Sequence, residues 1–219
     1  MSARNNDSPW KAPLERWSAR RSERPNLFVG IGGGSASGKS TIAADIARRL
    51  ARLAVEVINQ DRFFKPKDEL PTYHSNIYDE PRPAYNRPDC YREAEMFDEC
   101  RAARRGGGDG LPDVVILEGI LALYFEELRE LMDVSLYVEA DADERIIRRT
   151  RRNMAKWPFD EITNYYLESV RWDHIEFNAP TKRHADIVIP GGMADAAERE
   201  RLLTGLCGGV LGRWEGGAV

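Results

Sequence analysis

The chain has 219 residues, a length typical of a single α/β domain with a full hydrophobic core. Its formal net charge of −4 argues against a general nucleic-acid-binding protein, and the lack of any apolar run of about 18 residues argues against a membrane span. Three cysteines without C-x-x-C spacing, and an N-terminal segment without the apolar core of a secretory signal, predict a reduced, cytoplasmic protein.

The first 25 residues are polar, rich in Arg and interrupted by Pro. We expect a flexible arm or a short helix that lies on the domain. Trp10 and Trp17 have a spacing that places both on one face of a helix. Such a pair is expected to dock onto the body of its own domain in preference to a partner.

A phosphate-binding loop is predicted next. Leu27–Ile31 is a short apolar strand, and residues 41–53 have the spacing of an amphipathic helix. Between them, the segment from Gly33 to Ser40 matches G-x-x-x-x-G-K-[ST], the P-loop, in which backbone N–H groups contact phosphate oxygens. A helix that begins at about Gly38 directs its positive end at the same phosphates. A flexible Gly/Ser linker would lack this context of a strand before and a helix after.

The motif predicts the roles of its last residues. Lys39 is expected to reach the β and γ phosphates, Ser40 to offer its hydroxyl to Mg²⁺, and Thr41 to lie behind it in the first helical turn. The residues predicted to bind the nucleotide here are Gly33, Gly34, Ser35, Ala36, Ser37, Gly38, Lys39, Ser40 and Thr41.

Two acidic residues follow predicted strands. Asp61 comes after Val55–Asn59, and Glu118 ends the apolar segment Asp113–Leu117. Ligands of an open parallel sheet bind outside the carboxyl ends of the strands, so both carboxylates are expected in the crevice of Lys39. We favour catalysis by Asp61 over a helix cap. For Glu118 we favour a Mg²⁺-facing role, exerted through a water, over a cap or salt bridge.

Residues 66–88 contain five prolines and show no stable hydrophobic period. A long loop inside a compact domain is usually functional or disordered. This one carries aromatic and hydrogen-bonding side chains that suit a polar, ring-bearing substrate: Tyr73, His74, Tyr78, Asp79, Tyr85, Asn86 and Arg87. The alternative is a surface loop whose tyrosines pack onto the body.

The strand Val134–Val138 leads into a helix with acidic residues in its first turn. Arg148 and Arg152, one turn apart, are expected to face the crevice, clamp phosphate and offset charge in the transition state. Arg145 and Arg149 share an adjacent face of this helix. A small lid is expected over residues about 150–162, and the alternative for this run of charge is a solvated face.

Five predicted strands, the last at Ala185–Pro190, alternate with helices. This pattern indicates an α/β protein with a doubly wound, five-stranded parallel sheet and helices on both faces. A helix is also expected over residues 120–132, and a final one over residues 194–211.

Several segments together resemble the uridine kinase family of P-loop kinases, a group of nucleoside kinases. They are the P-loop, Asp61–Lys65, Ile116–Leu121, Ala142–Arg149, and Asn178–Pro190, which is similar to that family's P-T-K-x-x-A-D-x-I-I-P run. The resemblance covers residues 28–192 in order. It implies a P-loop kinase domain over residues 26–212, between an arm over residues 1–25 and a tail over residues 213–219.

The resemblance implies phosphorylation of a nucleoside 5′-hydroxyl with ATP and Mg²⁺. By position, Asp61 matches the family's base, Lys39 its phosphate-binding lysine and Ser40 its Mg²⁺-binding hydroxyl. The related kinases are often dimers or tetramers, which allows for a homo-oligomer. No nucleic-acid or membrane partner is expected.

The lid and the nucleotide side match the family in part. Arg148, Arg149 and Arg152 correspond to lid arginines, but Lys156–Phe159 stand where the family has further arginines. Lys182, in the Pro-Thr-Lys run, is expected to bind ATP beside the purine.

The acceptor side departs from the family pattern. The family's ribose-binding Asp aligns with Asn86, which leaves Asp79 or Asp89 as a substitute. A hairpin that carries Tyr and His to the pyrimidine in the family has no counterpart in the short connector at residues 106–112. The residues predicted to bind the acceptor are Asp61, Phe64, Tyr78, Asn86 and Asp89.

The segment Asp61–Pro66 is also similar to nicotinamide riboside kinases, which share the fold and the 5′-phosphorylation but not the base pocket. Three alternatives therefore stay open. The acceptor is nicotinamide riboside, or it is another hydroxyl metabolite such as pantothenate or a sugar phosphate. The third, from a different class, is a regulatory NTPase without a small-molecule acceptor.

Overall fold

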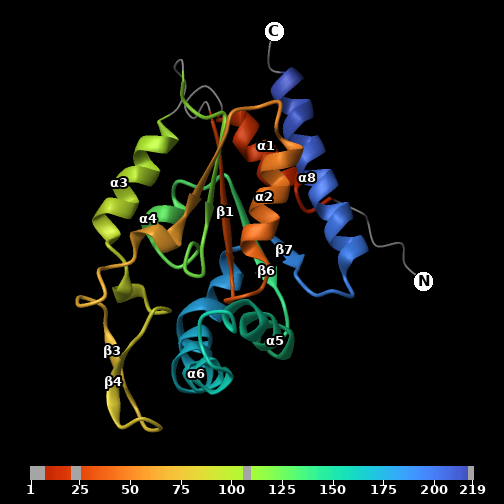
Figure 1. The fold of residues 1–219 in the computed structure, drawn as a ribbon. Coiled ribbons are helices and arrows are strands. Elements are labelled where there is room, and N and C mark those ends of the chain that lie inside the picture. Colours follow the sequence, from red (N-terminus) through yellow and green to blue (C-terminus); the bar gives the residue numbers. More distant parts are fainter. Residues whose placement is uncertain (1–7, 21–25, 106–109, 217–219) are drawn as a thin grey trace.

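The computed structural model describes residues 8–20, 26–105 and 110–216, which form a layered α/β structure (Figure 1). Within these residues, the central sheet has five parallel strands in the order β2-β5-β1-β6-β7. The strands are β1 (Leu27–Gly33), β2 (Val55–Asn59), β5 (Val114–Glu118), β6 (Val134–Glu139) and β7 (Ile187–Pro190). The predicted doubly wound, five-stranded parallel sheet is confirmed.

Helices cover both faces of this sheet (Figure 1). One face carries α1 (Lys11–Ala19), α2 (Lys39–Arg49) and α8 (Ala196–Gly216), and the other carries α3 (Glu93–Arg104) and α4 (Glu126–Arg129). Each face has its own apolar core. Because β1 and β5 are buried on both sides, they read as almost continuous apolar runs and not as alternating ones.

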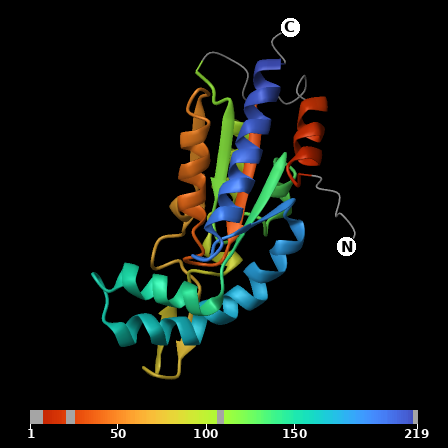
Figure 2. The ribbon, with the colours of Figure 1, turned by 90° about the vertical axis from the view of Figure 1, so that its right-hand side faces the viewer.

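The carboxyl ends of the strands meet at one edge of the sheet. The strand register places Glu118 beside Ile31 on one side and beside Asn59 on the other. The P-loop follows β1, and a short helix, η1 (Gln60–Phe63), follows β2. Helix α5 (Ala142–Asn153) begins after β6 and lies beyond the same edge (Figures 1 and 2). The residues predicted to carry the chemistry are therefore delivered to one end of the molecule.

Residues 66–88, expected to be an irregular loop, contain a β-hairpin. β3 (Thr72–Ser75) pairs antiparallel with β4 (Glu80–Pro83), and the short helix η2 (Pro88–Cys90) follows. A two-stranded hairpin consists only of edge strands, which tolerate proline because half of their N–H groups have no strand partner. The connector over residues 106–112, in which no hairpin was expected, lies partly outside the described residues.

The hairpin projects below the sheet and lies against the helix α6 (Phe159–Tyr165) (Figures 1 and 2). From α6 the chain continues in one helical run through η3 (Tyr166–Val170), α7 (Arg171–Asp173) and η4 (His174–Asn178), and then η5 (Ala179–His184). Both η3 and η4 are widened π-type turns, which are frequent at functional sites. The expected lid corresponds to the end of α5, the turn after it and the start of α6.

The helix expected over residues 120–132 is wrong in extent, because only α4 is helical there. The preceding residues form turns. The side-chain oxygen of Gln60 accepts a hydrogen bond of 2.9 Å from the amide of Leu121. The Leu121 amide is thus bonded to a distant side chain and not to a carbonyl oxygen of its own segment, as it would be in a helix.

The N-terminal segment is part of the core. Leu14 and Trp17 of α1 are fully buried, and the Trp17 ring stacks on Trp214 of α8 with 5.8 Å between centroids. The prediction of a flexible arm is thus wrong for residues 11–19. The alternative prediction, a short helix that lies on the domain, is what the structure has there. Likewise, α8 extends to Gly216, so the tail expected from residue 213 is helical as far as that residue. Residues 1–7, 21–25 and 217–219 lie outside the described part.

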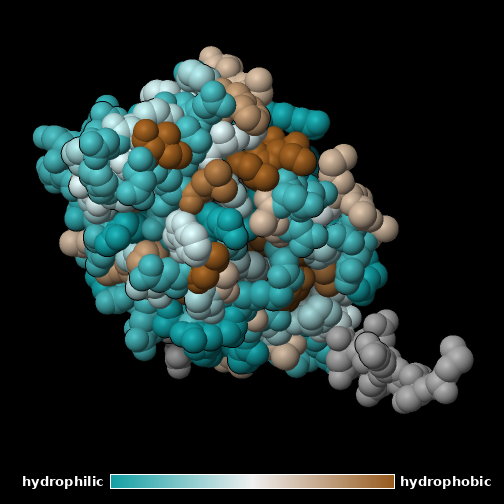
Figure 3. Space-filling view, turned by 90° about the horizontal axis from the view of Figure 1, so that it is seen from below, coloured by the Kyte–Doolittle hydropathy of each residue, from teal (hydrophilic) through white to brown (hydrophobic). Residues whose placement is uncertain are grey.

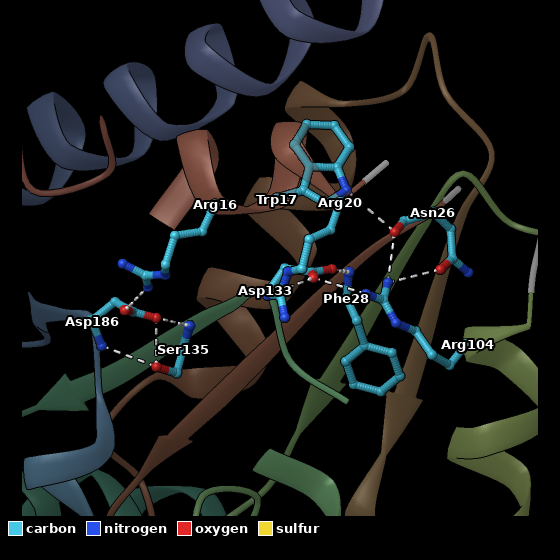
Figure 4. A network of polar contacts seen from close by, with 9 residues as sticks. All are labelled: Arg16, Trp17, Arg20, Asn26, Phe28, Arg104, Asp133, Ser135 and Asp186. Atoms are coloured by element: carbon cyan, nitrogen blue, oxygen red, sulfur yellow. Dashed lines mark hydrogen bonds and ion pairs between the residues drawn. The ribbon is translucent and has the colours of Figure 1, made fainter. Parts of the chain in front are cut away.

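A polar network ties α1 to the amino ends of the strands (Figure 4). The buried carboxylate of Asp133 pairs with Arg104 at 2.8 Å and accepts a hydrogen bond from the amide of Phe28 at 2.9 Å. Arg104 and the Trp17 indole both donate to the backbone oxygen of Asn26. This network lies at the end of the sheet opposite the P-loop. None of the described helices is long and apolar enough to cross a membrane.

Candidate active site

The P-loop has the backbone geometry that a phosphate cradle requires. Gly33 and Gly38 have φ values of 142° and 106°, which side chains with a Cβ rarely adopt. Helix α2 starts at Lys39 with Gly38 as its N-cap, as predicted. The N-terminus of a helix favours anions because its first N–H groups lack intrahelical partners.

A cavity of about 580 Å³ opens on the P-loop. Its lining residues are Ala36, Ser37, Gly38, Lys39, Ser40, Thr41, Ile42, Arg148, Arg152, Gly191 and Arg199. Arg148 and Arg152 thus lie where the helix spacing places them. Arg148 donates hydrogen bonds to the Gly191 oxygen and to Glu144, which fixes its side chain across the cavity wall. The volume and the cationic lining suit a polyphosphate.

Lys39 is buried beside this cavity. Its ammonium donates a hydrogen bond of 2.9 Å to the backbone oxygen of Gly34. Burial lowers the pKa of Lys39 to about 8, while the nearby carboxylates of Glu118 and Asp61 act in the opposite direction. A phosphate placed against this ammonium would favour its charged form.

Glu118 and Ser40 are brought together as expected. One carboxylate oxygen of Glu118 accepts hydrogen bonds from the Ser40 hydroxyl at 2.9 Å and from the Asn59 amide at 2.8 Å. Burial raises the pKa of Glu118, whereas Lys39 and Ser40 lower it. These two hard oxygen donors at the end of the P-loop fit Mg²⁺, which prefers oxygen ligands and keeps several of its waters.

Asp61 reaches the same edge through Asn59. The Asn59 side-chain oxygen accepts a hydrogen bond of 2.7 Å from the Asp61 amide, while its nitrogen contacts Glu118. Asn59 therefore links the two carboxylate-bearing segments. Asp61 is open to solvent, yet the protein atoms around its carboxylate raise its pKa, and the charges of Lys39 and Arg152 lower it in turn.

Arg149 contacts the P-loop directly, which the helix spacing did not predict. Its guanidinium donates a hydrogen bond of 2.9 Å to the Ser35 hydroxyl and lies 5.5 Å from the centre of the Tyr165 ring. Burial lowers the pKa of Arg149, and no described carboxylate forms an ion pair with it. A charged group held this way is available to an anion. The only signal in the sequence was its position among the lid arginines.

A second cavity, of about 620 Å³, lies between the foot of the hairpin, α5 and α6. It is lined by Lys67, Arg82, Pro83, Tyr85, Arg149, Asn153, Trp157, Glu161, Ile162 and Tyr165. Arg149 lines this cavity and also donates to Ser35, so one side chain joins the second cavity to the P-loop. On the face seen in Figure 3, hydrophilic residues cover most of the surface and hydrophobic ones form small separate areas.

None of the five residues predicted to bind the acceptor lines the second cavity. Asp61 lies beside Lys39, and the other four are placed as follows. Phe64 packs on Tyr91 with 4.8 Å between ring centroids, as a core residue would. Arg82 covers the ring of Tyr78 at 4.2 Å. Asp89 forms an exposed ion pair of 3.0 Å with its neighbour Arg87.

Asn86 is buried, and its side-chain nitrogen has no hydrogen-bond partner among the described residues. It lines a small hollow next to Ser35 of the P-loop. Lys182 forms an ion pair of 2.6 Å with Glu139, and the lining of the P-loop cavity does not include it. The sequence around Asn86 and Lys182 did not predict where their side chains lie, because both positions depend on segments far away in the chain, at Ser35 and Glu139.

The strand order, the P-loop on β1 and the acidic residues after β2 and β5 define a P-loop kinase. A phosphoribulokinase from Rhodobacter spheroides has a similar fold, with a TM-score of 0.56 and 14% identity over 75% of this chain and 70% of that one. The family model "Phosphoribulokinase / Uridine kinase family" matches residues 96–197.

Two curated relatives place the chain more closely. A uridine kinase of Clostridium tetani is 33% identical over 192 residues, which cover 78% of this chain and 89% of that protein. A uridine kinase of Clostridium botulinum is 34% identical over 191 residues, with 78% and 90% covered. The chain belongs to the phosphoribulokinase/uridine kinase family and is an ATP-dependent phosphotransferase that acts on a hydroxyl group.

Proposed function

We propose that this kinase transfers the γ-phosphoryl group of ATP to the 5′-hydroxyl of a nucleoside. The observation that carries the proposal is the position of Asp61 beside Lys39, with one cavity on the P-loop and a second cavity whose wall includes Arg149, the arginine held on Ser35. A kinase of a small acceptor needs this arrangement, because donor and acceptor must meet at a base.

The donor side holds the polyphosphate. The P-loop amides and Lys39 bind the β and γ phosphates, and Arg148 and Arg152 approach from the opposite wall. Arg149, held on Ser35, is placed to stabilise charge on the group in transfer. Ser40 and Glu118 hold Mg²⁺, which when bound neutralises charge on the phosphates.

Asp61 acts as the general base. Its carboxylate accepts the proton of the acceptor hydroxyl as the oxygen attacks the γ phosphorus. The protein atoms around its carboxylate raise the pKa of Asp61, while Lys39 and Arg152 act in the opposite direction. A raised pKa makes the carboxylate a stronger base than an ordinary aspartate. The backbone contact with Asn59 holds Asp61 in place.

The acceptor occupies the second cavity. The rings of Tyr85, Tyr165 and Trp157 suit a heterocycle, and the polar groups beside them suit hydrogen bonds to its edge. A nucleoside has both parts, since its ribose carries the hydroxyl and its base the ring. Nicotinamide riboside, pantothenate and sugar phosphates are the competing acceptors.

The purified chain should be incubated with ATP, Mg²⁺ and each of these acceptors, and the products separated by chromatography. We expect a nucleoside 5′-monophosphate to form together with ADP. Thermal shifts in the same panel should rise for the true acceptor by mass action. If water alone accepts the phosphoryl group, the protein is an NTPase and the proposal fails.

A further inference from the structure

The second cavity contains one pair of side chains that joins its two walls. Arg82 on β4 and Glu161 on α6 form an ion pair of 2.7 Å. Both side chains are mostly buried, with 21% and 29% of their surfaces exposed. Arg82 is also held by Glu80 at 3.1 Å and by the ring of Tyr78. The pair is therefore fixed in position before any acceptor arrives.

Glu161 is distinctive among the residues that line this cavity. It is the one carboxylate among them, whereas Lys67, Arg82 and Arg149 are cations. The hydroxyl of Tyr165 is already engaged by the amide of Tyr85, and the side-chain oxygen of Asn153 by Arg152. Glu161 is thus the strongest hydrogen-bond acceptor that the wall offers to a ligand.

The pair offers a donor and an acceptor side by side. A guanidinium has five N–H groups and a carboxylate about four lone-pair sites, so one mutual contact leaves most of both unused. The rings of Tyr85 and Tyr165 line the same cavity and can contact the faces of a flat ligand. A ring with an N–H group next to a carbonyl oxygen complements this arrangement.

We propose that Arg82 and Glu161 recognise the acceptor's base through such an amide-type edge. Glu161 accepts the ring N–H, and Arg82 donates to the adjacent carbonyl oxygen. This inference rests on the proposed function, since it requires that the acceptor be a nucleoside. It assigns specificity to the β3–β4 hairpin and to α6.

Matched nucleosides test the assignment. Uridine and inosine each carry an N–H beside a carbonyl, and 3-methyluridine and 1-methylinosine carry a methyl group at that nitrogen. For whichever parent is phosphorylated, kcat/KM should fall at least about tenfold on methylation, because a site built to bond an N–H rejects an analogue without it.

Two variants separate recognition from support of the fold. In Glu161→Gln the remaining amide oxygen is expected to stay on Arg82, and the new NH2 group cannot accept the ring N–H. The ratio of kcat/KM between parent and methylated nucleoside should therefore fall toward one while the KM for ATP stays unchanged. Glu176→Gln, on the same helical run but outside the cavity lining, is the matched control and should keep the wild-type ratio. A purely structural effect of Glu161→Gln would lower kcat/KM equally for the parent and the methylated nucleoside.

The outcomes are distinct. A high ratio in the wild type that is lost only in Glu161→Gln supports the assignment. Equal turnover of parent and methylated nucleoside, or an unchanged ratio in Glu161→Gln, overturns it while the kinase remains a nucleoside kinase. Phosphorylation of a non-nucleoside acceptor alone, or of water alone, overturns the proposed function and this inference with it.

Discussion

Glu168 holds Ser75 of the hairpin at a distance of 2.7 Å. The same carboxylate also accepts hydrogen bonds from the amides of Asn76 and Ile77, at the turn of the hairpin. Glu168 lies two helical turns after Glu161, so one face of the helical run carries both contacts to the hairpin. The hairpin and the helical run that begins with α6 are thereby joined along their length, with the second cavity at their base.

The Glu168 clamp is expected to matter for the acceptor and not for ATP. In Glu168→Ala, three donors of the hairpin lose their acceptor, and the wall containing Arg82 should become mobile. We expect KM for the acceptor to rise by about tenfold while KM for ATP changes less than about twofold. Steady-state kinetics with each substrate varied in turn measure this, with Glu176→Ala as the exposed control. Equal increases in both KM values would contradict a local role.

Asp61→Asn separates chemistry from binding. The amide cannot take the proton of the acceptor, so kcat should fall by at least about 10²-fold. Binding of ATP, measured by calorimetry, should stay near that of the wild type. Because the protein atoms around its carboxylate raise the pKa of Asp61, its charge is disfavoured in the fold, and the variant should melt no lower than the wild type. Turnover at the wild-type rate would show that another group is the base.

The activity of the wild type should also fall in acid through Asp61. Its pKa lies above the ordinary value of 3.8, so the loss of kcat/KM should begin at a higher pH than for an exposed aspartate. A pH–rate profile of kcat/KM under acceptor-limited conditions measures this limb. Asp61→Asn should lack it, and the same limb in that variant would assign it to a different carboxylate.

Binding of ATP should take up a proton at Lys39. Its pKa is about 8 in the free protein, and phosphate at the ammonium should raise it. Affinity for a non-hydrolysable ATP analogue is then full below this pH and falls as the pH rises above it. Calorimetry above pH 8 in buffers of different ionisation enthalpy would reveal the uptake. Lys39→Arg, whose guanidinium does not titrate, is the control, and equal uptake in this variant would exclude Lys39.

The same lowered pKa affects the stability of the free protein. Between about 8 and the ordinary value of 10.5, the unfolded chain binds more protons at Lys39 than the folded chain does. The contribution of Lys39 to the free energy of unfolding therefore rises with pH across this window.

The network at the opposite end should control stability and not catalysis. Asp133→Asn removes the carboxylate charge from a buried ion pair with Arg104, which should lower the free energy of unfolding by about 3–5 kcal/mol. Arg16→Ala breaks the pair with Asp186, whose arginine is 53% exposed, and should cost no more than about 1 kcal/mol. Urea unfolding of both variants compares them directly. Similar losses would contradict the difference in burial between the two ion pairs.

Local sequence patterns determined the donor half of the site. The spacing of the P-loop specifies its own backbone, and apolar runs specify buried parallel strands. Once the strands are parallel, Asp61 and Glu118 must emerge at the same edge as Lys39, because that edge collects every carboxyl end. The P-loop and the strands depend on residues that are close together in the chain. The positions of Asp61 and Glu118 depend on the parallel order of the strands, which the sequence pattern indicates.

Tertiary structure alone decided the second cavity, which we propose binds the acceptor. The contact of Ser75 with Glu168 joins residues 93 positions apart, and no periodicity encodes such a contact. The second cavity lies where the hairpin meets α5 and α6, so its lining of Arg82, Glu161 and Tyr165 was not visible in the sequence. The same reason explains why Arg149 bonds to the P-loop while Arg148 lines the cavity above it, since the tilt of a helix is set by what it packs against.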